Sequence, residues 1–270
     1  MASLAGRGDY NAPMFTTALK SLRVGTLLLS GALTVLLLFP HLDRAERARR
    51  VTRWAAGLLA IVGVRVRVEG RPPGVRSGGA LLAANHISWL DIHVLHSLLP
   101  ARFVSKAEVR GWPLIGWLAE AAGTVFLVRE KKADAKRVNA LMAEHLRLGE
   151  CLAIFPEGTT TDGGAILPFY PSLFQPAVDA QAQVWPVRIR YLTPAGAPCE
   201  AAAYFGGMSL GESFLKVIRA GGIVAEVRFL APVEGRGMAR RDLARAAEAA
   251  IRGENAGPGS APGSTVRLPA

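Results

Sequence analysis

Residues 24–42 form a run of 19 positions without a formal charge, and this run restricts the possible folds more than any other feature of the chain. The 16 positions before Pro40 would extend about 24 Å as a helix, whereas a hydrocarbon core is about 30 Å thick. A cleaved signal peptide is disfavoured, because no small-residue cleavage site follows before a block of arginines. The run therefore predicts a membrane-embedded helix, with a buried core helix of a soluble protein as the alternative.

A second helix is predicted directly after this run. Asp43 and Glu46 have the spacing of a capping box, and apolar residues then recur along one helical stripe that contains Trp54. Five arginines fall within ten residues: Arg44, Arg47, Arg49, Arg50 and Arg53. Such a helix suits a membrane interface, although an ordinary solvated helix can show the same pattern. Together the two segments predict a membrane-anchoring hairpin over residues 21–63, and the arginines place the following domain on the cytoplasmic face of the cell inner membrane.

The net charge separates the possible classes of partner. Half of the residues are apolar, yet the formal net charge is +11. A soluble nucleic-acid binder would be more polar, so the combination favours a surface facing anionic lipid headgroups and excludes a nucleic-acid partner. The two cysteines, Cys151 and Cys199, form no CxxC pair, which indicates a reducing compartment without a disulfide framework.

From residue 64 onward, strand-like and helix-like segments alternate. Strand patterns cover residues 64–68, 80–84, 103–106, 123–129, 151–155, 184–192 and 223–230; helical patterns start at residue 88 and cover 112–118, 134–148, part of 169–180, a segment after Ser209, and 239–252. The alternation predicts an α/β fold: a single domain over residues 64–252 with a mixed, largely parallel sheet flanked by helices. Residues 1–20 are predicted to be a flexible tail, and residues 253–270, dominated by Gly, Pro, Ser and Ala, a disordered one.

A base and a carboxylate lie at a short spacing where one predicted strand meets a helix. His86 falls in the turn after residues 80–84, and Asp91 falls in the first or second turn of the helix that is expected to start at Ser88. At this spacing the carboxylate can accept from one ring nitrogen and leave the other free as a base. The pair predicts a proton-abstracting site. Ser88 is expected to be the N-cap of the helix, because no GxSxG elbow surrounds it.

Two further histidines, His93 and His96, lie near Asp91, and a cluster of His and Asp residues can indicate a metal site. The spacing lacks the close histidine pairs of hydrolytic metal sites, and no suitable pair follows downstream. No metal is therefore predicted, and a metal-dependent lipid hydrolase remains an alternative.

Four short blocks occur in a recognisable order. They are Asn85-His86 with Asp91; Gly123, Phe126 and Arg129; Phe155-Pro156-Glu157-Gly158-Thr159; and Val184-Trp185-Pro186-Val187-Arg188-Ile189. A segment from Lys106 through Gly116-Trp117 lies between the first two blocks. With these blocks the chain resembles the glycerolipid acyltransferase family, of the lysophosphatidic acid acyltransferase (1-acyl-sn-glycerol-3-phosphate acyltransferase) type, over about residues 20–230.

The resemblance implies a membrane-bound O-acyltransferase of phospholipid biosynthesis. It would move a fatty acyl group from a thioester, on coenzyme A or acyl carrier protein, to the free hydroxyl of 1-acyl-glycerol-3-phosphate, with His86 as general base and Asp91 orienting the imidazole. No cofactor is implied besides the thioester co-substrate, and the implied partners are membrane lipids, the lysolipid acceptor and acyl carrier protein. Glu157 would fix its loop or bind the glycerol of the acceptor. The implied substrate-binding residues are Lys106, Gly123, Phe126, Arg129, Glu157, Gly158 and Thr159.

One position departs from the family pattern. In many members with a phosphate acceptor, the third block resembles the motif FPEGTR. This chain has Thr160 in place of the arginine. The run from Thr159 to Gly163 resembles bacterial members that include lyso-ornithine lipid acyltransferases, so lyso-ornithine lipid is an alternative acceptor. Arg188 and Arg190 are candidates to replace the missing charge. A non-catalytic lipid-binding protein is the alternative of another class, because the predicted anchor alone would suffice for it.

Overall fold

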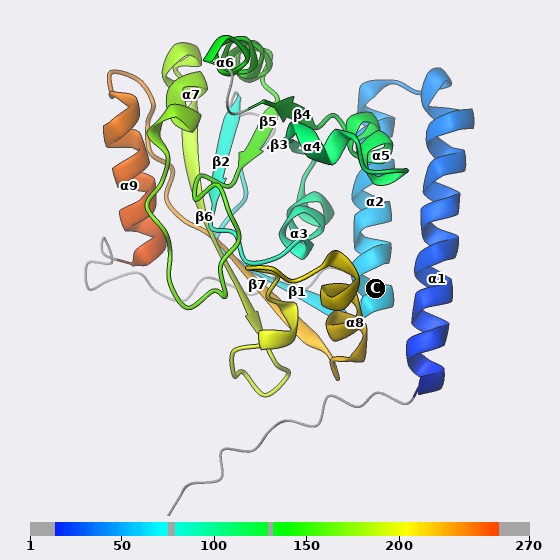
Figure 1. Ribbon diagram of the computed structural model, residues 1–270. Helices are drawn as coiled ribbons and strands as arrows, with labels where there is room; N and C mark the ends of the chain where they lie inside the picture. Colours follow the sequence, from blue (N-terminus) through cyan, green and yellow to red (C-terminus); the bar gives the residue numbers. More distant parts are fainter. Residues whose placement is uncertain (1–13, 75–78, 129–131, 254–270) are drawn as a thin grey trace, which may run out of the picture.

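The computed structural model describes residues 14–74, 79–128 and 132–253 (Figure 1). Most of the predicted tail of residues 1–20, nearly all of the predicted disordered tail and Arg129 lie outside the described residues. The described part consists of a helical hairpin beside an α/β domain. The second helix of the hairpin ends at Val62, and the first strand of the domain begins at Val64.

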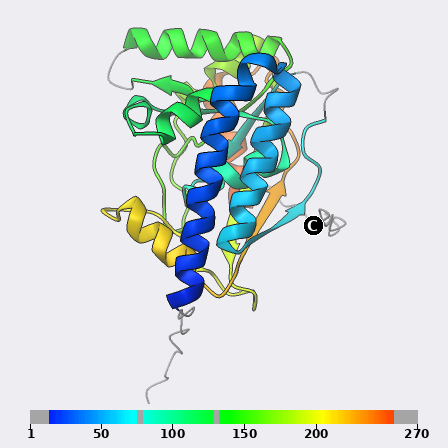
Figure 2. The same ribbon diagram turned by 90° about the vertical axis from the view of Figure 1, so that its right-hand side faces the viewer.

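Two antiparallel helices form the hairpin. α1 (Met14–Leu33) continues through a π-helical turn (η1, Thr34–Leu38) and a 3-10 turn (η2, Phe39–His41), and α2 (Arg44–Val62) returns beside it (Figure 2). α1 begins inside the predicted tail of residues 1–20, because the segment after Met14 is rich in good helix formers. Lys20 Nζ donates to Ile218 O (3.0 Å), which ties this early part of α1 to the domain.

The start of α2 follows half of the predicted capping box. Asp43 Oδ1 accepts from Glu46 N (2.7 Å), but the Glu46 carboxylate pairs with arginines of the next turns instead of returning to Asp43. Gly63, at φ +88°, ends the helix in the left-handed conformation that favours glycine. The predicted apolar stripe of α2 is confirmed, because Ala55, Leu58, Leu59 and Val62 are buried.

A seven-stranded sheet forms the centre of the domain, with the order β1-β7-β6-β2-β5-β3-β4. All neighbouring strands are parallel except β6 and β7, so the predicted mixed, largely parallel sheet is confirmed. The strands are β1 (Val64–Glu69), β2 (Ala80–Ala84), β3 (Arg102–Lys106), β4 (Val125–Leu127), β5 (Cys151–Ile154), β6 (Gln183–Leu192) and β7 (Ile223–Phe229). β2 is buried at every position, as its apolar run predicts.

Helices cover both faces of the sheet and create two separate apolar cores. α2, α3 (Leu90–Leu98) and α8 (Leu210–Arg219) pack on one face, together with a 3-10 turn (η4, Glu200–Ala202). α6 (Lys132–Arg147), α7 (Gln175–Ala180) and α9 (Arg240–Arg252) pack on the other, with a 3-10 turn (η3, Pro171–Phe174). α1 forms an outer layer on α2 and α8.

Some predicted boundaries differ from the structure. The helix expected from Ser88 begins at Leu90, and the helix expected over residues 112–118 is α5 (Ile115–Ala121), preceded by a short helix, α4 (Ala107–Arg110), that the sequence did not indicate. The strand expected over residues 123–129 is reduced to β4, which is mostly half-buried because it lies at the edge of the sheet. The capping box at Ser209 and Glu212 is confirmed at the start of α8.

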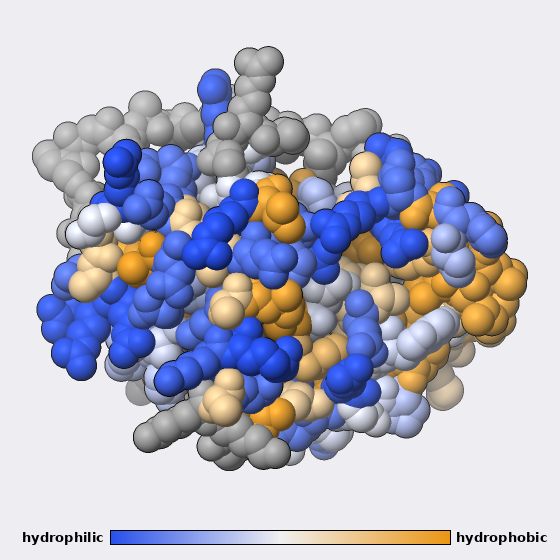
Figure 3. All heavy atoms as spheres, turned by 90° about the horizontal axis from the view of Figure 1, so that it is seen from above, coloured by the Kyte–Doolittle hydropathy of each residue, from blue (hydrophilic) through white to orange (hydrophobic). Residues whose placement is uncertain are grey.

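Within the described residues, the helical stretch Met14–His41 (28 residues) is long and apolar enough to cross a membrane. Large apolar side chains are exposed along it, including Phe15, Leu22, Leu29 and Leu36. Figure 3 shows hydrophobic surface gathered on the side of the molecule where the hairpin lies, while much of the same view is hydrophilic. Only 17% of the most apolar 18-residue segment of this helical stretch is buried, whereas the core helix of a soluble protein is mostly buried.

Candidate active site

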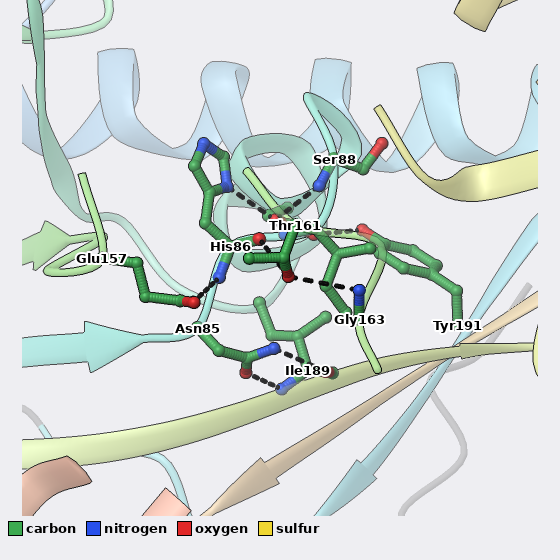
Figure 4. Close-up of polar contacts among 10 residues, drawn as sticks. Asn85, His86, Ser88, Glu157, Thr161, Gly163, Ile189 and Tyr191 are labelled. Carbon is green, nitrogen blue, oxygen red and sulfur yellow. Dashed lines mark hydrogen bonds and ion pairs between the residues drawn. The ribbon is translucent and has the colours of Figure 1, made fainter. Parts of the chain in front are cut away.

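His86 and Asp91 form a hydrogen-bonded pair at the carboxyl edge of the sheet (Figure 4). His86 follows the last residues of β2, and Asp91 lies in the first turn of α3. His86 Nδ1 is 2.7 Å from Asp91 Oδ2. Asp91 is fully buried, whereas the His86 side chain remains 18% exposed. A carboxylate on Nδ1 favours the tautomer that leaves Nε2 without a proton, so Nε2 can act as a base.

Asp91 receives hydrogen bonds from three further donors. The backbone amides of Ile87 and Ser88 donate to Oδ2 at 2.7 and 2.9 Å, and the Tyr191 hydroxyl donates to Oδ1 at 2.6 Å. Burial raises the pKa of Tyr191 well above its usual value, and the adjacent Asp91 carboxylate adds to the increase. The phenol therefore stays protonated as a donor. With both oxygens held, the carboxylate keeps one orientation toward His86.

The imidazole of His86 also stacks on Phe155, the residue that follows β5. The two ring centroids are 3.9 Å apart and the planes differ by 9°. Phe155 in turn stacks on Phe103 of β3, with centroids 5.9 Å apart. The stack and the Asp91 hydrogen bond together restrict rotation of the imidazole, which pre-organises the base.

The backbone of His86 is held by the loop after β5. Glu157 Oε1 accepts from His86 N and Glu157 Oε2 accepts from Leu167 N, both at 2.8 Å, while Thr161 N donates to His86 O at 2.9 Å. Glu157 is only 3% exposed, and burial raises the pKa of its carboxyl, although both backbone hydrogen bonds oppose that increase. Of its two expected roles, the structure supports fixing the loop, because both carboxylate oxygens already have backbone partners.

Asn85 locks the end of β2 to β6. Its side-chain Nδ2 donates to Ile189 O (3.0 Å), and its Oδ1 accepts from Ile189 N (2.7 Å). The amide thus copies the pairing of a backbone peptide beyond the last regular pair of these strands, Ala84 with Val187. The position of His86, one residue later, follows from this link.

The structure brings most of the predicted site residues to one edge of the sheet. Lys106 ends β3 and is exposed, Phe126 lies in β4, and the loop with Glu157, Gly158 and Thr159 follows β5. In parallel sheets, ligands bind outside the carboxyl ends of the strands, where Lys106, the loop after β5 and His86 lie. Phe126, in the middle of β4, instead lines a hollow with Gly123 and Arg102. Arg129 lies outside the described residues.

Gly123 is placed differently. It precedes β4, at the amino end of that strand, and therefore away from the carboxyl edge. Its φ is +89°, and a Cβ here would lie 2.6 Å from Arg102 Nη1. The structure thus explains this glycine by a left-handed turn and a close neighbour. Its expected contact with substrate remains a prediction.

Two other expectations are corrected by the geometry. Arg188 and Arg190 alternate along β6 with Val187, Ile189 and Tyr191, which pack in the core shared with α3. The arginines therefore face the opposite side of the sheet from His86 and are not placed to replace the missing arginine. Ser88 is not the N-cap of α3, since its Oγ is buried without a hydrogen-bond partner among the described residues and the helix starts later.

Tyr191 and Phe155 are site residues whose roles the sequence did not indicate. Tyr191 lies two residues after Ile189 and continues the buried alternation of β6. Its position on the buried face could therefore be predicted from the pattern of the strand. Its contact with Asp91 was not, because the two residues are 100 positions apart. Phe155 belongs to a recognised block, but the sequence carries no signal that its ring lies on His86.

His93 and His96 lie in α3 but take no part in the base. Burial lowers the pKa of His93 to about 4 and that of His96 to about 3, to which the neighbouring His93 contributes. The His93 ring contacts the indole rings of Trp54 and Trp89, at centroid distances of 5.7 and 5.8 Å. Within the described residues there is no group of three or more His, Cys, Asp or Glu side chains that could hold a metal ion.

A histidine held by a buried carboxylate at the carboxyl edge of an α/β sheet has the arrangement of a general base. Residues 65–190 match the family model described as Acyltransferase. The chain is 40% identical over 214 residues to the lyso-ornithine lipid O-acyltransferase of Pseudomonas aeruginosa, covering 79% of this chain and 81% of that protein. It is 39% identical over 151 residues to the 1-acyl-sn-glycerol-3-phosphate acyltransferase of Neisseria meningitidis, covering 56% of this chain and 59% of that protein. The chain belongs to the acyltransferase family and is an O-acyltransferase.

The fold is also that of a solved relative. The crystal structure of the 1-acyl-sn-glycerophosphate (LPA) acyltransferase PlsC from Thermotoga maritima matches with a TM-score of 0.63 at 19% identity, covering 92% of this chain and 98% of that one. Family membership confirms the predicted resemblance and favours an enzyme over both a non-catalytic lipid binder and a metal-dependent hydrolase. With the apolar helix α1, it indicates membrane association.

Proposed function

We propose that this enzyme transfers a fatty acyl group from a thioester to the free hydroxyl of a lysolipid at the membrane surface, with His86 as the general base. The observation that carries the proposal is the 2.7 Å hydrogen bond between His86 Nδ1 and the buried Asp91 carboxylate. It leaves Nε2 of a partly exposed, firmly held imidazole as the proton acceptor. The thioester is the co-substrate, on coenzyme A or acyl carrier protein, and no cofactor takes part.

The reaction balances with these two residues. Nε2 takes the proton of the lysolipid hydroxyl as its oxygen attacks the thioester carbonyl carbon, and the imidazolium is stabilised by Asp91. The tetrahedral intermediate then breaks its carbon–sulfur bond, and the thiolate takes the proton back from Nε2. The new ester and the free thiol leave His86 neutral again. A covalent acyl-enzyme is not required.

Lyso-ornithine lipid is the acceptor that the loop after β5 favours. Thr160 occupies the position at which many members with a phosphate acceptor have an arginine. The loop therefore has one cation fewer with which to bind a phosphate group. Asp162 lies in the same loop, one residue after Thr161, whose amide bonds to His86 O. Asp162 is exposed, accepts a hydrogen bond from Gly164 N (2.8 Å) and has no ion pair with a described residue. An ornithine headgroup has an ammonium group, which the Asp162 carboxylate would attract. The same carboxylate would repel a phosphate group.

1-Acyl-glycerol-3-phosphate is the second candidate acceptor. Lys106, at the exposed end of β3, is a cation at the same edge of the sheet as His86. A relative of 39% identity, that from Neisseria meningitidis, is named for this acceptor. Both acceptors present a hydroxyl to the same base, so the proton transfer is the same for either.

The orientation on the membrane follows from charge. The arginines at the start of α2 are exposed, with Arg44, Arg49 and Arg53 between 62% and 75% accessible. An excess of arginine beside an apolar helix favours the cytoplasmic leaflet. We therefore place the α/β domain on the cytoplasmic face of the inner membrane, where the thioester donors are soluble.

The test is an acceptor panel with the full-length enzyme in phospholipid vesicles. Acyl transfer to lyso-ornithine lipid and to lysophosphatidic acid is measured with acyl-coenzyme A and with acyl-carrier-protein donors. Transfer is expected with at least one acceptor, to be lost by more than a hundredfold in His86→Ala, and to be retained in His145→Ala, a matched variant on the amino side of the sheet. Full activity of His86→Ala would refute the proposal. Equal vesicle binding of both variants shows that the loss is chemical.

A further inference from the structure

The segment between α4 and α5 exposes a dense group of large apolar side chains. Four of the six residues in 112–117 are large apolar residues between 40% and 41% exposed: Trp112, Leu114, Ile115 and Trp117. We call residues 112–117 the apolar turn. Outside the hairpin, the other exposed large apolar residues of the described chain are scattered singly. A concentrated patch of this kind on a protein surface marks a contact with another apolar surface.

The local backbone builds this exposure. Gly116 is buried, and a Cβ at this position would lie 2.2 Å from Arg110 O, so only glycine lets α5 pack across the end of α4. Leu114 adopts φ +61°, a left-handed value that is unfavourable for a branched side chain. The tight reversal leaves both tryptophans on the outside. Strained backbone of this kind is concentrated at functional sites.

The apolar turn lies on the same side of the molecule as α1. In Figure 1, α4 and α5 lie beside the upper half of the hairpin. In Figure 2, they lie on one side of α1, and α2 lies on the other. The segment follows Lys106 at the carboxyl end of β3, the edge of the sheet that also holds His86. It therefore adds exposed apolar surface to the side of the domain that carries the hairpin.

We propose that the apolar turn is a second lipid-contacting element, which inserts Trp112 and Trp117 into the headgroup boundary of the same membrane that α1 enters. Tryptophan favours this boundary, because its ring is amphipathic. The neighbouring cations Lys106 and Arg110 are exposed beside the patch, as anionic headgroups require, although Arg110 also pairs with Glu120 (2.6 Å). A second copy of the chain would need a larger apolar patch to form a stable dimer.

The contact has a consequence for the reaction. With α1 and the apolar turn both in the interface, the carboxyl edge of the sheet faces the lipid headgroups, and a lysolipid can reach His86 without leaving the bilayer. The inference concerns docking and does not depend on which lysolipid is acylated.

The position of the turn is tested with spin labels on single introduced cysteines. Trp112→Cys is compared with Leu22→Cys on α1 and with Tyr170→Cys, an exposed aromatic position at the start of η3, which packs with α9 on the face of the sheet away from α2. Burial raises the pKa of Cys151 to about 12 and also raises that of Cys199, so the native thiols react slowly, and unsubstituted protein provides the blank. Vesicles of phosphatidylethanolamine and phosphatidylglycerol, three to one, supply the membrane.

On vesicles, the label at position 112 is expected to become accessible to oxygen and shielded from a water-soluble nickel relaxant, as at position 22, while position 170 stays in water. A label at 112 that remains in water while position 22 is embedded would overturn the inference. So would protection of position 112 without vesicles in a protein of dimeric mass, since that outcome assigns the patch to a second copy.

A kinetic arm separates docking from chemistry. The double variant Trp112→Ser/Trp117→Ser is expected to lose several-fold activity on acceptor in vesicles and to keep wild-type activity on a short-chain, water-soluble lysolipid. Equal activity on both acceptors contradicts the inference. Loss on both points to a folding or catalytic defect, and the labelling result then decides. Failure of the wild-type enzyme on every acceptor would instead refute the proposed function.

Discussion

The Tyr191 hydroxyl lies 2.6 Å from Asp91 Oδ1, on the side of the carboxylate opposite the oxygen that holds His86. Both side chains are buried, and the hydrogen bond joins β6 to α3 across the core. Tyr191 thus holds the carboxylate that orients the base, without being placed to touch the substrate itself. It is a positioning residue.

Replacing Tyr191 by Phe is expected to lower kcat at least tenfold and to leave the KM of donor and acceptor unchanged. The variant keeps the ring but removes one hydrogen bond to a charged group, which is worth about 1.5–3 kcal/mol. The carboxylate is then free to turn away from His86 Nδ1. Steady-state kinetics at saturating concentrations of both substrates measure the effect.

Tyr170→Phe is the matched control, because Tyr170 is exposed and its hydroxyl has no partner among the described residues. It should behave as the wild-type enzyme. A Tyr191→Phe variant with normal kcat and raised KM would show that this hydroxyl serves substrate binding instead.

Replacing Asn85 by Ala is expected to lower the free energy of unfolding by about 2–4 kcal/mol, because Ile189 N and O would lose their partners in a buried site. Urea denaturation followed by circular dichroism measures this change. The control is Asn139→Ala, whose side chain makes one exposed hydrogen bond and should alter stability by less than about 0.5 kcal/mol. Equal losses in both variants would contradict the role assigned to Asn85.

The elements that the sequence predicted well are those whose signal is local. β2 matches the apolar run of residues 80–84 at both ends, and the His86–Asp91 pair follows from a spacing of five residues at a strand-to-helix turn. A short loop admits few conformations, so the geometry was implied by the pattern. The α/β class likewise follows from alternation along the chain.

The parts that could not be predicted depend on contacts between distant residues or on backbone strain. Tyr191 reaches Asp91 only because β6 lies beside β2 in the sheet, and an order of strands is not written in the pattern of any one strand. The same neighbours place Arg188 on the face away from His86. Leu114, at φ +61°, breaks local preference, so a helix starting at residue 112 was expected where the chain turns.

Acceptor choice should respond to charge in the loop after β5. Thr160→Arg and Asp162→Asn each remove the preference for an ammonium-bearing headgroup, and each is expected to raise the ratio of kcat/KM for lysophosphatidic acid over lyso-ornithine lipid about tenfold, as for roughly 1.4 kcal/mol per charge contact. Competition between the two acceptors in the same vesicles measures the ratio directly.

Two controls isolate the charge. Thr160→Gln has similar bulk without a charge, and Asp179→Asn removes an exposed carboxylate from α7, remote from the loop. Neither should change the ratio. If Thr160→Gln shifts it as much as Thr160→Arg, then size and not charge at this position selects the acceptor.

Stability should fall in mild acid because of His96. Burial lowers its pKa from 6.5 to about 3, so between these values the unfolded chain binds a proton that the folded chain does not. The stability that comes from keeping His96 neutral is complete above pH 6.5 and is lost as the pH falls toward 3. At pH 4.5 the loss amounts to roughly 2–3 kcal/mol.

His96→Leu removes this titration and a buried Nδ1 without a partner among the described residues, so its free energy of unfolding should change less between pH 7 and pH 4.5 than that of the wild type. Urea denaturation at both pH values measures this change. If the free energy of unfolding depends on pH equally in the two proteins, then protonation of His96 does not destabilise the folded state.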